Sequence, residues 1–291
     1  MKSVNIDTVV LDIDGVIVDV HDSYRRAIMD TVEDFTGVRP PDETIQSLKD
    51  AGGFNNDWEV TYALVLWNLI PETDRVLSYS DVIRHVTEKR QGLEGFQECL
   101  EQSIDVSVLE PALNDWEPDK IRDRFQERYL GEELFVELEG TQPQREFSGY
   151  IHEEPLLLDD KTVNELEENV QIGILTGRPS AEAQIALDRA GLDLPESRIY
   201  TMDDWDYGKP HPQALINLSE VMDSEVLLYA GDTLDDIRTV INARKQKDDV
   251  EFIACGVLTG GLRGESGRKR YQKTGADMIL EDINSLTSYL H

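Results

Sequence analysis

The chain has 291 residues, 40% of them hydrophobic, which is enough for one large core or for a core domain with a second domain. Its 59 acidic and 28 basic residues give a formal net charge of −31, so nucleic acids and anionic membranes are not expected as partners. No apolar run of about 18 residues predicts a transmembrane helix, and no basic start followed by an apolar stretch predicts a secretory signal.

The acidic residues are spread along the chain and interleaved with apolar residues, and arginine outnumbers lysine. We interpret this composition as an adaptation to a cytoplasm of high salt, where ions screen the self-repulsion of an acidic surface. The two cysteines, Cys99 and Cys255, lie in unrelated segments. Neither a disulfide framework nor a cysteine metal site is therefore expected, and a reducing cytoplasm fits.

Short apolar runs rich in β-branched residues, most of them closed by glycine or threonine, predict six buried strands. In chain order they are Val9–Ile13, Val170–Leu175, Arg198–Thr201, Val226–Ala230, Phe252–Leu258 and Met278–Leu280. Helical patterns lie between most of them, at residues 180–190, 212–221 and 236–245. Because strands that alternate with helices form parallel sheets with helices on both faces, the sequence predicts an α/β, Rossmann-like core.

The alternation breaks after the first strand, where helical spacing takes over. Helical segments are expected from Tyr24 to Phe35, and at residues 57–69, 81–90 and 119–129. The simplest organisation is an inserted, mostly α-helical domain of roughly 135 residues. The α/β core would then comprise residues 1–20 and 157–291, and the insert residues 21–156.

Carboxylates lie at the ends of two of the predicted strands. Asp12 and Asp14 are two residues apart, so along a strand their side chains point to the same face. Asp232 and Asp236 follow the strand that ends before Gly231. Such a group at the carboxyl edge of a parallel sheet repels itself unless a cation neutralises it. All-oxygen ligation suits a hard divalent cation, and we expect Mg²⁺.

Groups that bind anions follow two other strands. Thr176 and the amide of Gly177 are donors after the second strand, and the helix that opens at Pro179 adds the positive end of its dipole. Lys209 lies in the loop after the third strand, where it balances carboxylates and a bound phosphate. The alternative interpretations are a turn pair for Asp12 and Asp14, an N-cap for Asp232, an ordinary strand-end threonine and a solvated lysine.

Together these segments resemble the four ordered motifs of the haloacid dehalogenase superfamily. The segments are Asp12-Ile13-Asp14-Gly15-Val16, Ile174-Leu175-Thr176-Gly177, Gly208-Lys209-Pro210 and Gly231-Asp232-Thr233-x-x-Asp236. Each is weak alone, but all four stand in the family's order. The match covers the α/β core, about half of the chain, and the helical insert resembles the cap of subfamily I, although it is larger than that cap usually is.

The resemblance implies a phosphohydrolase in which Asp12 attacks phosphorus and Asp14 acts as general acid and then as general base. Thr176, Gly177 and Lys209 would hold the phosphoryl oxygens. Mg²⁺ would be bound by Asp12, the backbone carbonyl of Asp14, Asp232 and Asp236. The substrate implied is a small phosphate monoester, and the enzyme would be cytoplasmic.

Three other functions are alternatives to a phosphatase. A phosphomutase shares the first chemical step and hands the phosphoryl group to a second hydroxyl. A 2-haloacid dehalogenase displaces halide, which needs no proton, so Asp14 argues against it. A non-catalytic binding protein has no need of Asp12, Asp14 and Lys209 together.

Features outside the four motifs predict less. The loop around Phe54 and Asn55 either selects the substrate or only connects two helices. Arg178 either reaches the substrate or pairs with one of the many acidic residues. The basic segment Arg263–Arg270 is interpreted as a loop with local ion pairs, with a phosphate-rich partner as the alternative.

Overall fold

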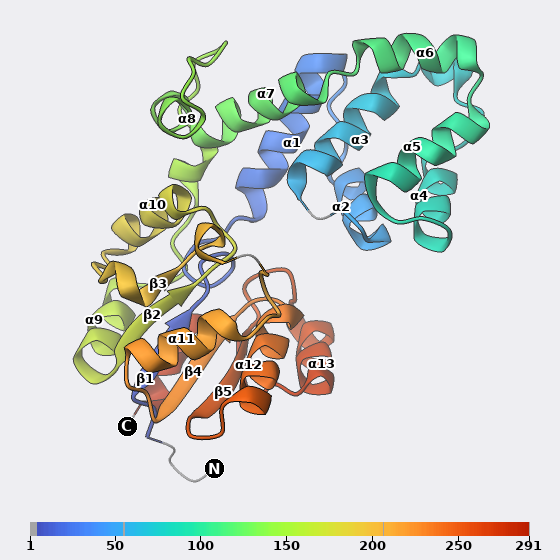
Figure 1. Ribbon diagram of the computed structural model, residues 1–291. Coiled ribbons are helices and arrows are strands. Elements are labelled where there is room, and N and C mark those ends of the chain that lie inside the picture. The colour runs from blue at the N-terminus through green and yellow to red at the C-terminus, as the bar shows by residue number, and fades with distance from the viewer. Residues whose placement is uncertain (1–4, 55, 206, 291) are drawn as a thin grey trace. The chain divides into compact units, whose positions relative to one another are not determined.

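The computed structural model describes residues 5–54, 56–205 and 207–290. The chain divides into two compact units (Figure 1). The α/β unit comprises Met1–His21 and Glu154–His291, and the helical unit comprises Asp22–Glu153. Among the described residues, no helix is both long and apolar enough to cross a membrane.

The α/β unit contains a parallel sheet in the order β3-β2-β1-β4-β5-β6. Its strands are β1 (Thr8–Leu11), β2 (Gln171–Leu175), β3 (Ile199–Tyr200), β4 (Val226–Gly231), β5 (Glu251–Val257) and β6 (Met278–Leu280). Every predicted strand is present, and β3 is the one most shortened. The central strand β1 lies between β2 and β4, with Leu11 opposite both Ile174 and Ala230. This register brings the ends of the three strands to one edge.

Helices cover both faces of this sheet, as the alternation predicts (Figure 1). They are α9 (Asp160–Asn169), α10 (Ser180–Ala190), α11 (Gln213–Val221), α12 (Leu234–Gln246) and α13 (Gly264–Thr274), with a 3₁₀ helix at Ile283–Tyr289. Val9 and Leu11 join a core cluster with α9 and α10, whereas Val10 joins a second cluster with α11 and α12. Alternate side chains of β1 thus point to opposite faces, and both faces are buried.

The helical unit consists of α1 to α8 within the described residues. Their bounds are α1 (His21–Thr36), α2 (Asp42–Ala51), α3 (Asp57–Leu69), α4 (Tyr79–Glu88), α5 (Gly92–Ser103), α6 (Val106–Asp115), α7 (Pro118–Leu130) and α8 (Glu132–Glu139). Helix α3 is its centre, because it is apolar on most sides and packs against α2, α5, α6 and α7. Three of the predicted helices correspond to α3, α4 and α7 within two residues at each end.

Two segments of the α/β unit, residues 17–19 and residues 155–158, run side by side. The amide of Asp19 donates to the carbonyl of Pro155 at 2.8 Å, and the amide of Leu157 donates to the carbonyl of Ile17 at 2.8 Å. Val18 and Leu156 form an antiparallel bridge. The segment at residues 154–158, where the chain returns to the α/β unit, is therefore fixed by main-chain hydrogen bonds.

Candidate active site

The end of β1 presents Asp12 and Asp14 in different environments. The amide of Asp12 donates to the Ala230 carbonyl at 2.9 Å, so Asp12 extends the pairing with β4, and it is only 3% exposed. The side chain of Asp14 is 34% exposed. Gly15 then turns the chain with φ +69°, and a Cβ there would lie 2.6 to 2.8 Å from the Asp232 side chain. Only glycine fits this close approach.

Lys209 lies among the carboxylates rather than in solvent. Its Nζ is 2.6 Å from Oδ2 of Asp12 and 2.7 Å from Oδ1 of Asp236. The hydroxyl of Tyr229, in the middle of β4, lies 3.3 Å from the same nitrogen. The structure therefore joins the first, third and fourth predicted motifs through one ammonium group.

Asp12, Asp232 and Asp236 form a group of carboxylates whose oxygens lie within 4.8 Å of one another. Asp236 is already saturated: its Oδ2 accepts from the amide and hydroxyl of Thr233, and its Oδ1 contacts Lys209 and accepts from Tyr229. Thr233, rather than Asp232, is the N-cap of α12, and Asp236 completes the capping box. Asp232 is buried and accepts from the amide of Gly261 at 3.1 Å.

The pKa values of these three carboxyl groups reflect the repulsion between their negative charges. Burial raises the pKa of Asp12 to about 7, with Asp236 and Asp14 adding to the rise and Lys209 opposing it. Burial also raises the pKa of Asp232 well above its ordinary value, and Asp236 and Asp12 add to it. Burial would raise the pKa of Asp236 too, but the ammonium of Lys209 and the bonds from Thr233 outweigh it and lower the pKa. One ammonium does not neutralise the group, so a further cation is favoured beside Asp12 and Asp232.

Thr176 and Gly177 lie at the same edge of the sheet, because β2 is the neighbour of β1. The amide of Thr176 donates to the Tyr200 carbonyl at 2.9 Å, and its hydroxyl accepts from the amide of Arg178 at 3.2 Å. A Cβ on Gly177 would meet nothing within 4 Å. The space beside this glycine suits an anion that approaches the main chain.

The remaining candidate residues have other surroundings. Arg178 is buried in the α/β unit and pairs with Asp14 and Glu154. Phe54 is half-buried in the helical unit, Asn55 lies outside the described residues, and Asn56 is the N-cap of α3. The basic segment Arg263–Arg270 forms most of helix α13 rather than a loop. Its arginines are paired locally, since Arg268 contacts Glu281 and Arg263 donates to the Gly260 carbonyl.

Sequence reasoning missed Tyr229 and Glu154. Tyr229 reads as an ordinary apolar position of a buried strand, yet its single hydroxyl donor lies within hydrogen-bond distance of two acceptors, the Leu175 carbonyl at 3.0 Å and Oδ1 of Asp236 at 2.9 Å. A tyrosine in the middle of a buried apolar run is itself a signal, because its hydroxyl needs a partner there. Glu154 lies in a connecting segment, and no local pattern marks it.

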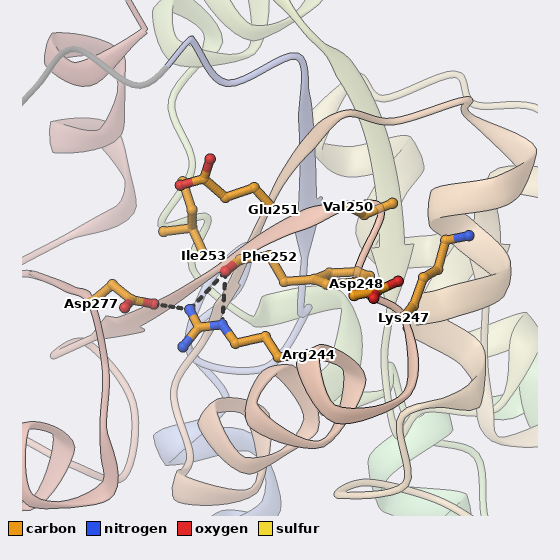
Figure 2. Close-up of a pocket in the computed structure, with 8 residues that line it drawn as sticks. All are labelled: Arg244, Lys247, Asp248, Val250, Glu251, Phe252, Ile253 and Asp277. Atoms are coloured by element: carbon orange, nitrogen blue, oxygen red, sulfur yellow. Dashed lines mark hydrogen bonds and ion pairs between the residues drawn. The ribbon is translucent and has the colours of Figure 1, made fainter.

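A hollow of about 540 Å³ lies away from these residues (Figure 2). It is lined by Arg244, Lys247, Asp248, Val250, Glu251, Phe252, Ile253 and Asp277. Arg244 donates twice to the Phe252 carbonyl, at 2.9 and 2.7 Å, and pairs with Asp277. The hollow is at the start of β5, whereas the carboxylates follow the opposite ends of the strands.

Comparisons with known proteins bear on the family and the fold. The family model for haloacid dehalogenase-like hydrolases matches residues 6–244. A phosphatase from Thermococcus thioreducens is 22% identical, with a TM-score of 0.66 and 97% of each chain covered. A predicted phosphoglycolate phosphatase from Haemophilus somnus is 12% identical, with a TM-score of 0.57 and 99% of each chain covered. At these identities the likeness is one of fold.

A curated sequence matches only locally. Imidazoleglycerol-phosphate dehydratase from Phytophthora nicotianae is 46% identical over 61 residues. That stretch is 21% of this chain and 13% of the dehydratase. The chain thus spans a small part of that protein's length.

Proposed function

The chain belongs to the haloacid dehalogenase-like hydrolases, and we propose that within this family it is a Mg²⁺-dependent phosphatase that forms an aspartyl-phosphate on Asp12. The observation that carries the proposal is the contact of Lys209 with both Asp12 and Asp236 beside a third buried carboxylate, Asp232. These contacts lie at the carboxyl edge of one sheet, and they support the proposed roles of Asp12 as nucleophile, Lys209 as fixed positive charge and Asp232 as cation ligand. The proposed substrate is a small phosphate monoester.

The residues present fit a magnesium ion. The donors are carboxylate oxygens, which hard divalent cations prefer, and the raised pKa values of Asp12 and Asp232 mark negative charge that the protein leaves unbalanced. Asp12, Asp232 and the carbonyl of Asp14 would hold the ion, and the saturated Asp236 would act through water. When bound, Mg²⁺ offsets the charge repulsion between a carboxylate and a phosphate.

In the proposed first step, a carboxylate oxygen of Asp12 bonds to phosphorus while the ester P–O bond breaks. The leaving oxygen takes its proton from Asp14, whose side chain is more exposed than that of Asp12 and therefore accessible to substrate. In the second step, water attacks the phosphorus of the aspartyl-phosphate, Asp14 takes a proton from that water, and phosphate and Asp12 are released. Lys209, Thr176 and Gly177 orient the phosphoryl oxygens throughout.

Release of inorganic phosphate from p-nitrophenyl phosphate tests the proposal. The assay compares the wild type, Asp12→Asn and Asp235→Asn in high KCl, with Mg²⁺ and with EDTA. Asp235 is the matched control, because it is next to the site in sequence but half-exposed and paired with Arg238. We expect activity that requires Mg²⁺, is lost in Asp12→Asn and persists in Asp235→Asn. Equal activity in wild type and Asp12→Asn would overturn the proposal.

A panel of small phosphate monoesters then defines the substrate class. It includes sugar phosphates, phosphoglycolate and imidazoleglycerol phosphate, the last two because of the proteins to which this chain is similar. Transfer of phosphate to an added sugar with little free phosphate would identify a phosphomutase instead. We further propose that the inserted helical unit acts as a cap that excludes macromolecules, so a phosphoprotein should be turned over far more slowly than a small ester.

The acidic composition supports a further part of the proposal, function in a cytoplasm of high salt. At a net charge of −31 the folded chain repels itself, and about 1 M salt shortens the screening length to about 3 Å. The free energy of unfolding, measured by urea titration, should therefore rise with KCl concentration. A value that is the same in dilute buffer and in high KCl would count against this adaptation.

A further inference from the structure

A buried ion pair between Arg178 and Glu154 contacts Asp14 from the interior of the α/β unit. Arg178 donates from Nε to Oδ1 of Asp14 at 2.6 Å and from Nη2 to Oε2 of Glu154 at 2.8 Å. The side chains of Arg178 and Glu154 are each 1% exposed, whereas that of Asp14 is 34% exposed. The three groups therefore form a chain that begins in the interior and ends on a carboxylate that reaches solvent.

Arg178 and Glu154 are themselves fixed by other contacts. Arg178 follows Thr176 and Gly177 after β2, and its main-chain carbonyl accepts from the amide of Met202 at 3.0 Å. The carbonyl of Glu154 accepts from Arg189 of α10. Residue 154 also precedes the segment that is paired to residues 17–19. The guanidinium is thus held at a defined place relative to the end of β1.

Burying such an ion pair carries a cost in folding free energy. Removing an arginine and a glutamate from water costs several kcal/mol per ion, and apolar side chains of similar volume are often at least as stable. A purely structural role therefore does not account for it. The guanidinium does something that an apolar side chain cannot do, since it fixes one oxygen of Asp14 and leaves the other for proton transfer.

We propose that Arg178, held by Glu154, is a positioning residue that aims the carboxyl group of Asp14 at the leaving oxygen and later at the attacking water. This inference rests on the proposed function of Asp14. Asp14 lies after the end of β1 and directly before the turn at Gly15, where a side chain without a partner samples several rotamers. Proton transfer requires a fixed group within hydrogen-bond reach, so holding one oxygen contributes directly to the rate.

The test replaces both residues of the pair by apolar ones in one variant, Arg178→Met with Glu154→Leu, so that neither charge of the pair stays buried without the other. Arg178→Lys is the conservative variant. Arg244→Met is the matched control, because Arg244 also joins a carboxylate and a main-chain carbonyl, but at the start of β5 and away from Asp14. Urea unfolding first establishes that each variant is folded.

Two substrates separate positioning from a general loss of structure. An alkyl phosphate has a poor leaving group that needs a proton, whereas p-nitrophenolate leaves without one. We expect the phosphorylation step of the alkyl phosphate to slow by about 100-fold in the double variant. The same step with p-nitrophenyl phosphate should change by less than about 5-fold, and nitrophenolate should appear in a burst, because hydrolysis of the aspartyl-phosphate now limits turnover. Arg178→Lys should recover part of the loss, and Arg244→Met should behave as wild type.

Equal slowing of the first step for both substrates, or no slowing for either, would overturn the inference. A crystal structure of the double variant supplies a second readout that does not depend on turnover. The Asp14 carboxylate should occupy one rotamer in the wild type and several in the variant, and a single unchanged rotamer would contradict positioning. If the wild type proves inactive while Asp14 disperses in the variant, the proposed phosphatase function fails and the positioning of Asp14 stands.

Discussion

The tight packing of glycine against Asp232 gives a sharp test of the candidate metal site. A Cβ added to Gly260 would lie 2.5 Å from both Cβ and Cγ of Asp232, and closer still to one of its carboxylate oxygens. Gly260 does not have a positive φ, so alanine fits its backbone, and the three atoms nearest to the added Cβ all belong to Asp232. Gly261 is the matched control, because a Cβ there meets nothing within 4 Å.

The size of the effect follows from these distances. Ordinary contact of a Cβ begins at about 3.4 Å, so Cβ and Cγ of Asp232 must move by about 0.9 Å in Gly260→Ala, and its nearest carboxylate oxygen must move farther. Metal–ligand distances tolerate only about 0.2 Å, and a misplacement of about 1 Å can cost about 100-fold in rate. We expect kcat/KM of Gly260→Ala to fall by about 100-fold and its half-saturating Mg²⁺ concentration to rise at least about 10-fold. The stability cost should be about 1 to 3 kcal/mol.

The assay is phosphate release as a function of Mg²⁺ concentration at fixed KCl, with the unfolding free energy measured on the same samples. Gly261→Ala should stay within about 3-fold of wild type in both rate and Mg²⁺ requirement, because the backbone amide that donates to Asp232 is retained. A Gly260→Ala enzyme with the Mg²⁺ dependence of the wild type would refute the placement of Asp232 at the metal.

Three more predictions concern buried polar groups. In EDTA, Asp232→Asn should raise the unfolding free energy, because a buried carboxyl group with a raised pKa destabilises the folded state near neutral pH. With Mg²⁺ at 100 times its Kd, the wild type should gain about 2.7 kcal/mol of stability, and Asp232→Asn should lose this gain. Tyr229→Phe should lower that free energy by about 1 to 3 kcal/mol in urea titrations, because the Leu175 carbonyl loses its buried donor; no loss would contradict the hydrogen bond. Burial alone would raise the pKa of Asp34, but the guanidinium groups of Arg128 and Arg124 outweigh burial and lower the pKa. The stability that Asp34 contributes is therefore complete above its ordinary pKa of 3.8, and it is lost as the pH falls through the lower pKa of the folded state. Asp34→Asn should therefore cost about 2 kcal/mol at pH 7 and less at pH 3 in unfolding titrations, and a cost that does not depend on pH would contradict the pairing.

The local parts of the fold could be predicted from the sequence. The strands are short apolar runs closed by glycine or threonine, and Asp12, Thr176 and Asp232 stand directly after three of them. Parallel strands end at a common edge, so placing these residues together needed no knowledge of tertiary contacts. The same locality explains why α3, a long apolar helix with an N-cap at Asn56, was predicted at its observed bounds.

Helices α5, α6 and α8 are not predicted, because their sequences lack a clear helical pattern. Helix α5 contains Gly92 and Gly95, which weaken helix propensity, and α6 contains Pro111 in its interior. Helix α8 has only eight residues, too short for a clear periodic pattern. In these segments, tertiary packing within the helical unit decides the structure.

The site residues that were missed depend on contacts between distant parts of the chain. Arg178 is a candidate from the sequence, but its local pattern does not distinguish a substrate from an acidic side chain as its partner, and the same long-range dependence applies to it. Its pairing with Asp14 spans 164 positions, and its pairing with Glu154 spans 24. The position of Glu154 depends on the pairing of the two connecting segments, which carries no periodic signal.

The most direct test of the central claim is to trap phosphate on the enzyme. The wild type is mixed with a ³²P-labelled phosphate ester and Mg²⁺, quenched in acid within one turnover, and reduced with borohydride, which converts an aspartyl-phosphate to homoserine. Mass spectrometry of the tryptic peptide that spans residues 3–25 then locates the modified residue. We predict homoserine at Asp12 and none in a parallel sample of Asp12→Asn. Rapid turnover without label on the enzyme, or homoserine at a different aspartate, would contradict the proposed mechanism.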